Sequence, residues 1–144
     1  MAGISAKLPL ARDPDDGIGL HKDYRDSVRQ NIIMLLLTVP GERMMIPEFG
    51  VGLKTYLFEQ DNLILRQEIA AKFREQLNLY LPFVDLLDIS FASEADDPNI
   101  SENTLVIRIE YAITPLDAVD VLILEASEQD KSIVVRPNDL TTIL

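Results

Sequence analysis

The side chains that could do chemistry in this chain are mostly carboxylates. Glu42, Glu48 and Glu59 lie within one short stretch, and Phe49 and Phe58 adjoin the second and third of them. Two carboxylates about 5 to 9.5 Å apart, one with a raised pKa, would be the machinery of a glycoside hydrolase. The chain has no Trp and only 6% aromatic residues, so we expect both Phe rings to pack in the core rather than stack on sugars. We predict no enzymatic activity and no catalytic residue, and keep a peptidoglycan hydrolase as the alternative.

Other catalytic and ligand sites fail on residue type or spacing. His21 is the single histidine and there is no Cys, so neither a His-pair metal site nor a nucleophilic triad can form. The aspartates within 13–16 resemble the start of a calcium loop, but Ile18 and Tyr24 stand where that loop needs Gly and Glu. The glycines of 50–52 lack the third glycine of a dinucleotide loop. We therefore predict turns at these places, and no metal or cofactor.

Composition excludes further classes of function. The net charge is −11 and the 13 Lys and Arg residues are scattered, whereas a nucleic-acid surface needs clustered basic side chains that release phosphate counterions. The longest apolar run, Ile32–Leu37, is far shorter than the ~20 residues of a membrane span. No N-terminal segment has the order of a signal peptide. We expect no nucleic-acid or membrane partner, and synthesis in the cytoplasm.

Two helices are expected after an extended N-terminal arm. Residues 1–22 have little periodicity and contain prolines and a turn-prone run, so we predict an arm there and a single domain over 23–144. Asp23 can cap a helix with apolar helical spacing that ends near Thr38, before Pro40. A second helix should begin at Asp61 or Asn62 and end before Pro82, with a buried stripe at Ile69, Phe73, Leu77 and Leu81.

The remainder of the chain predicts strands. Leu87, Ile89 and Phe91 alternate with polar residues, 104–113 alternates almost ideally, and 119–126 is apolar on both faces. Short strands are predicted over 43–46 and 133–136. These elements predict an α+β fold, in which two main helices pack on one face of a small, mostly antiparallel sheet.

Glu42 and Arg43 form an adjacent acid–base pair in the turn between the helices. Pro40 and Gly41 shape this turn, and a guanidinium offers a planar set of donors suited to carboxylates or carbonyls across an interface. The alternative is that both charges only cap the first helix and stabilise the turn.

The stretch PGERMMIPEFGVGLKTYLFE, from Pro40 to Glu59, resembles the signature of the baseplate-wedge family of contractile tails. This family is also called tail-lysozyme-like or sheath-initiator, and occurs in contractile phages, tailocins and injection systems. The resemblance covers about 15–126. It implies a structural protein that docks on the wedge core, with the partner-binding positions carried over to Pro40, Gly41, Glu42, Arg43, Pro47, Glu48, Phe49 and Gly50.

The resemblance also implies a second partner. The family is similar to the strand-exchanging domain of the tail sheath protein, so the sheet would offer an edge to the sheath and start its assembly at the baseplate. Six copies per particle would follow from six-fold baseplates. Besides the hydrolase, a generic acidic adaptor domain remains as an alternative.

Overall fold

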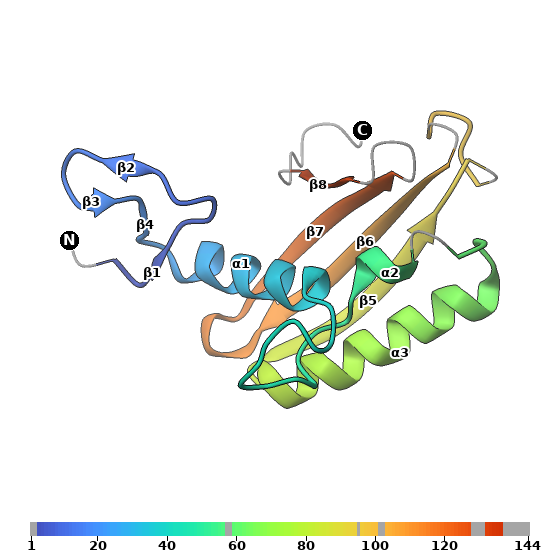
Figure 1. Cartoon of the computed structure of the whole chain (residues 1–144), viewed down its shortest axis with the longest axis horizontal. Helices are drawn as coiled ribbons and strands as arrows, with labels where there is room; N and C mark the ends of the chain where they lie inside the picture. Colours follow the sequence, from blue (N-terminus) through green and yellow to red (C-terminus); the bar gives the residue numbers. More distant parts are fainter. Residues whose placement is uncertain (1–2, 57–58, 95, 101–102, 128–131, 137–144) are drawn as a thin grey trace.

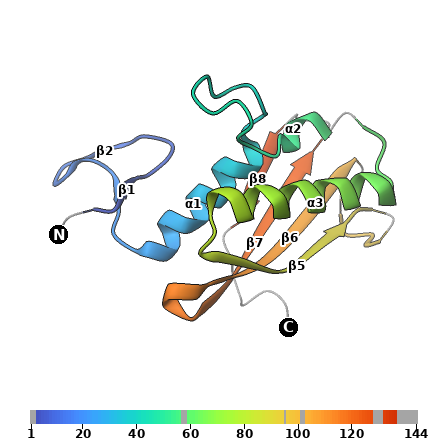
Figure 2. The ribbon, with the colours of Figure 1, turned by 90° about the horizontal axis from the view of Figure 1, so that it is seen from below.

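The computed structural model places two long helices on one face of a four-stranded antiparallel sheet, as the sequence predicts (Figures 1 and 2). It describes residues 3–56, 59–94, 96–100, 103–127 and 132–136. The strands follow one another in the order β5-β6-β7-β8. The elements of the main body are α1 (Tyr24–Leu37), α2 (Leu53–Tyr56), α3 (Leu63–Tyr80), β5 (Val84–Ala92), β6 (Thr104–Ile113), a 3-10 turn (Thr114–Leu116), β7 (Ala118–Ser127) and β8 (Ser132–Arg136).

Local signals fix both ends of α1. The Asp23 carboxylate caps the helix by accepting from the Arg25 amide at 3.2 Å. At the other end, the Thr38 amide and hydroxyl both donate to the Met34 carbonyl. Pro40 then prevents continuation of the helix. The predicted start and end of the first helix are confirmed.

The second long helix, α3, also matches its prediction. Asn62 is the cap, accepting from the Leu65 amide at 2.8 Å. The predicted stripe is buried throughout, and its members are Ile69, Phe73, Leu77 and Leu81. The short α2 was not predicted from the sequence.

The sheet places its apolar residues in rows that cross the strands. Phe91 lies opposite Ile107, Ile107 opposite Leu124, and Leu124 opposite Val135. A bulge interrupts β5 between Leu86 and Asp88. Because a bulge inserts one residue and reverses the alternation, Leu87 is exposed rather than aligned with Ile89 and Phe91.

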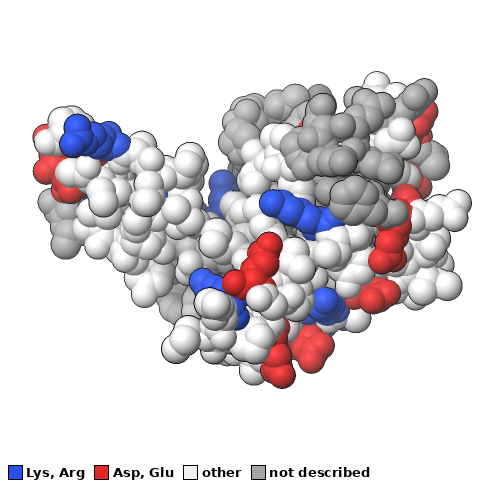
Figure 3. All heavy atoms as spheres, viewed as in Figure 1, with Lys and Arg blue, Asp and Glu red and all other residues white. Residues whose placement is uncertain are grey.

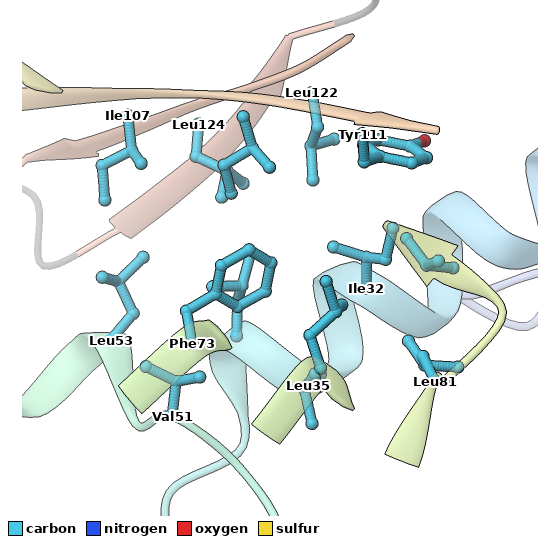
Figure 4. Close-up of a cluster of buried hydrophobic side chains, with 14 of the residues drawn as sticks. Ile32, Leu35, Val51, Leu53, Phe73, Leu81, Ile107, Tyr111, Leu122 and Leu124 are labelled. Carbon is cyan, nitrogen blue, oxygen red and sulfur yellow. The ribbon is translucent and has the colours of Figure 1, made fainter. Parts of the chain in front are cut away.

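The core lies between this sheet and the helices (Figure 4). From the sheet, Ile107, Tyr111, Leu122 and Leu124 point toward the helical layer, and Ile32, Leu35 and Phe73 point back toward them. These side chains are almost completely buried. At ~25 cal/mol per Å² of apolar surface, this burial is the main source of stability.

A partly buried ion pair ties α1 to the sheet. Nη2 of Arg29 donates to both carboxylate oxygens of Asp120, at 2.9 and 3.0 Å, and the Tyr111 hydroxyl donates to the same carboxylate at 3.1 Å. Burial, and to a lesser extent the negative charge of Asp120, raises the pKa of Tyr111 to about 12. The pair fixes the orientation of α1 over β6 and β7.

The N-terminal segment doubles back on itself instead of running out as one extended arm. β1 (Ser5–Ala6) pairs with β4 (Leu20–His21), and β2 (Arg12–Asp13) pairs with β3 (Gly17–Ile18). The reversal is local, because the Asp13 carboxylate accepts from the amides of Asp15 and Asp16. The arm packs along the first half of α1, where the Gln30 side chain accepts from the Leu8 amide at 2.9 Å and donates to the Ala6 carbonyl at 2.8 Å. A domain boundary at residue 22 stays a prediction.

The net charge of the chain is −11. On the face drawn in Figure 3, Lys and Arg side chains are scattered among other residues. Among the described residues, no helix is both long and apolar enough to cross a bilayer.

Candidate functional site

The candidate site is the loop between α1 and α2, which projects from the helical layer (Figure 2). Its stem is closed by a hydrogen bond from the Gly41 amide to the Pro47 carbonyl at 2.8 Å. The strand predicted over 43–46 is wrong. These residues are exposed and the closed stem leaves them no neighbouring strand with which to pair.

The base of the loop is held by a buried side chain from α3. Gln76 accepts from the Gly50 amide at 2.9 Å and donates to the Glu48 carbonyl at 3.1 Å. Gly50 has φ +112°, and a Cβ at this position would overlap the carbonyl of Thr38. Only glycine fits here, since both the backbone angle and the available space exclude a side chain.

Glu42 and Arg43 make different contacts and no ion pair with each other among the described residues. The Glu42 carboxylate accepts from the Val39 amide at 3.0 Å, so it stabilises the turn that follows α1. Cζ of Arg43 lies 4.2 Å from the centre of the Phe49 ring. Phe49 in turn makes an edge contact with Tyr80, with ring centres 4.8 Å apart. Arg43 is therefore positioned by an aromatic stack and has no carboxylate partner in the described chain.

The tip of the loop carries two methionines that sequence reasoning missed. Met44 is 95% exposed and Met45 is 94% exposed. They directly follow the charged pair. Because apolar residues between a turn and a proline are also typical of a short strand, the sequence did not identify them as exposed. The signal that could have identified them is their position in a loop closed by two prolines, with no partner strand nearby. Flexible methionines suit an adaptable contact with another protein.

The structure divides the eight predicted site residues into two groups. Phe49 and Gly50 are buried and belong to the base. The other six are exposed and belong to the part of the loop that projects beyond the base. They are Pro40, Gly41, Glu42, Arg43, Pro47 and Glu48.

The described residues contain no group of acidic or histidine side chains that could hold a metal ion. Glu42 is committed to a backbone amide, while Glu48 and Glu59 are exposed. Phe49 is buried as predicted, whereas Phe58, for which core packing was also predicted, lies outside the described residues. His21 lies in β4, where its Nε2 is 2.9 Å from Gln30 Oε1 and its Nδ1 is buried.

Comparisons of the sequence and of the fold with known proteins both find baseplate proteins. A family model described as baseplate wedge protein gp25 matches residues 22–115. Baseplate wedge protein gp25 of Enterobacteria phage T4 is 25% identical over 118 residues, covering 78% of this chain and 85% of the phage protein.

Two solved structures share the fold. A chain of the cryo-EM structure of the anti-feeding prophage baseplate has a TM-score of 0.64 and 26% identity, covering 77% of this chain and 84% of its own. A candidate tail lysozyme from Geobacter sulfurreducens has a TM-score of 0.59 and 23% identity, covering 83% and 97% of the two chains. The similarity to the Geobacter sulfurreducens protein shows only that the two chains share a fold.

Proposed function

Because this chain belongs to the gp25 family of baseplate wedge proteins, we propose that the α1–α2 loop docks it on the wedge core of a contractile injection machine. The chain is a structural baseplate component. The family match over residues 22–115, which includes the whole loop, is the observation that carries this assignment.

The contacts of the loop support a docking role. The base is fixed by Gln76, so the stem has a defined shape before any partner arrives. Arg43 presents a cation that no described carboxylate neutralises, next to two almost fully exposed methionines. Buried aromatic, Arg and Met side chains are enriched at the centres of protein interfaces. A partner that offers an apolar surface beside a carboxylate would satisfy both groups.

The test is capture of the wedge proteins encoded beside this chain, with wild type compared with Arg43→Glu. Arg74→Glu is the matched control, since Arg74 is an exposed Arg on α3 outside the loop. We expect Arg43→Glu to lose about 2–5 kcal/mol of binding while both variants keep the wild-type melting temperature. Equal binding by all three proteins would show that Arg43 does not contact the wedge partner and that the loop is only a structural turn.

We also propose that the sheet starts sheath assembly by accepting a strand at β8. The described sheet has two edges, β5 and β8. A bulge and the exposed Asp85 and Asp88 disfavour pairing at β5. β8 pairs with β7 without a register shift, and Ile133, Val134 and Val135 give it an apolar centre. An extended apolar segment of the sheath protein fits this edge.

Matched substitutions on the two edges distinguish them. Val134 on β8 and Leu87 on β5 are exposed to similar degrees, at 52% and 54%. We expect Val134→Lys to reduce sheath polymerisation from assembled baseplates, because edge lysines block strand addition, and Leu87→Lys to leave it unchanged. The reverse pattern would assign the accepting edge to β5.

We infer six copies around a six-fold baseplate and no catalytic role. A turnover assay on purified peptidoglycan, with Glu42→Gln beside wild type, should give no hydrolysis by either protein. Hydrolysis by wild type that the variant lacks would restore the glycoside hydrolase interpretation.

A further inference from the structure

A cavity of about 420 Å³ lies next to the loop, and Arg43 and Phe49 are the two predicted site residues that line it. Helix α1, the loop and the end of α3 line it, and Leu8 of the N-terminal segment completes it. Residues from four separate parts of the chain therefore form one hollow.

The floor and the rim of this cavity have different character. Leu35, Phe49 and Leu81 form a buried apolar floor. The exposed lining residues form the rim: Asn31 and Arg43 are polar, and Leu8 and Ile46 are apolar. A recess with an apolar floor and a mixed rim that carries a cation is suited to an apolar side chain with an acidic neighbour.

Among the described residues that line the cavity, Arg43 is the single charged one. The chain as a whole has a net charge of −11, and the neighbouring Glu42 carboxylate accepts a hydrogen bond from the Val39 amide rather than from Arg43. Its position is fixed by Phe49, which contacts Tyr80 at the cavity wall. In the described chain, no carboxylate pairs with Arg43. A ligand that neutralises it must bring its own carboxylate.

We propose that this cavity is an anchor pocket for a partner chain, and that it receives a bulky apolar side chain directly followed or preceded by Asp or Glu. The apolar side chain fills the floor formed by Leu35, Phe49 and Leu81, and the carboxylate binds Arg43 at the rim. The inference rests on the proposed function for the identity of the partner, which is a wedge protein. The pocket itself rests on the cavity and its charge alone.

The chain offers a matched pair of variants for the test. Asn31→Trp places an indole at the cavity rim, while Asn78→Trp places the same side chain on an exposed position of α3 outside the lining. Affinity for the wedge proteins encoded beside this chain is measured for wild type, both variants and Arg43→Glu. We expect Asn31→Trp to bind at least tenfold more weakly and Asn78→Trp to bind within twofold of wild type.

If Asn31→Trp binds like wild type while Arg43→Glu does not, the pocket is overturned and the docking loop stands. If wild type binds no wedge protein, docking fails and a second measurement decides the pocket. In that measurement, the ¹⁵N-labelled full chain is titrated with acetyl-Phe-Glu-amide, acetyl-Phe-Lys-amide and acetyl-Ala-Glu-amide. We expect the first to bind at least threefold more tightly than the others and to shift the amides of Asn31 and Tyr80. Equal shifts with all three peptides, or none, would overturn the proposal.

Discussion

The base and the tip of the α1–α2 loop have opposite physical character. At the base, Gly50 and Gln76 are buried and share a hydrogen bond. At the tip, Met44 and Met45 are almost fully exposed. The base determines the shape of the loop and the tip supplies surface for a partner. Substitutions at the base should therefore change stability first, and substitutions at the tip should change binding with little effect on stability.

The largest expected effect on stability is at Gly50. A Cβ there overlaps the Thr38 carbonyl and φ is +112°, so Gly50→Ala should cost about 3–5 kcal/mol of unfolding free energy. Gly41 is the matched control because it has φ +97° and open space around its Cα. Gly41→Ala should cost only about 1–2 kcal/mol. Urea unfolding of the two variants measures both values, and equal losses would show that the close approach to Thr38 is unimportant.

The next largest effect is at Gln76. Gln76→Leu removes the partners of the Gly50 amide and the Glu48 carbonyl, and leaves two backbone groups without hydrogen bonds. We expect a loss of about 2–4 kcal/mol. Chemical denaturation gives this value, and hydrogen exchange at the Gly50 amide should accelerate in the same variant. Unchanged exchange would mean that other contacts hold the base.

The core, unlike the loop, should make the unfolding free energy depend on pH through Tyr111. Burial raises the pKa of Tyr111 to about 12, above its value of ~10 in an unfolded chain. The folded state thus holds this proton more tightly, so the stabilisation is complete below pH 10 and is lost as the pH rises from 10 to 12. We expect on the order of 2 kcal/mol of additional alkaline destabilisation in wild type compared with Tyr111→Phe. Parallel pH curves for the two proteins would contradict this assignment.

The smallest effect on stability is expected at the tip. Met44→Ser and Met45→Ser change exposed side chains, so each should alter the unfolding free energy by less than about 0.5 kcal/mol. Thermal melting of the double variant checks this. A melting temperature well below that of wild type would show that the tip packs against the body.

Much of this fold could be predicted because helix caps and apolar periodicity depend on residues that are close together in the sequence. Asp23 and Asn62 cap their helices as expected, and the stripe from Ile69 to Leu81 is buried. The alternation of 104–113 became β6. The bulge that exposes Leu87 was not predictable, since it depends on how β5 pairs with β6.

The candidate site was predicted less completely. The turn residues and the charged pair were visible in the sequence, but the exposure of Met44 and Met45 and the support from Gln76 arise from tertiary contacts. Gln76 looks like any polar position on a helix until α3 is packed beneath the loop. The cavity beside Arg43 likewise requires segments that are distant in the sequence.

The most direct test of the docking account is the affinity of the Met44→Ser, Met45→Ser double variant for the wedge proteins encoded beside this chain. With a melting temperature equal to that of wild type, the account predicts at least a tenfold loss of affinity, or about 1.4 kcal/mol. Wild-type affinity in this folded variant would contradict the claim that the tip of the loop docks the chain on the wedge.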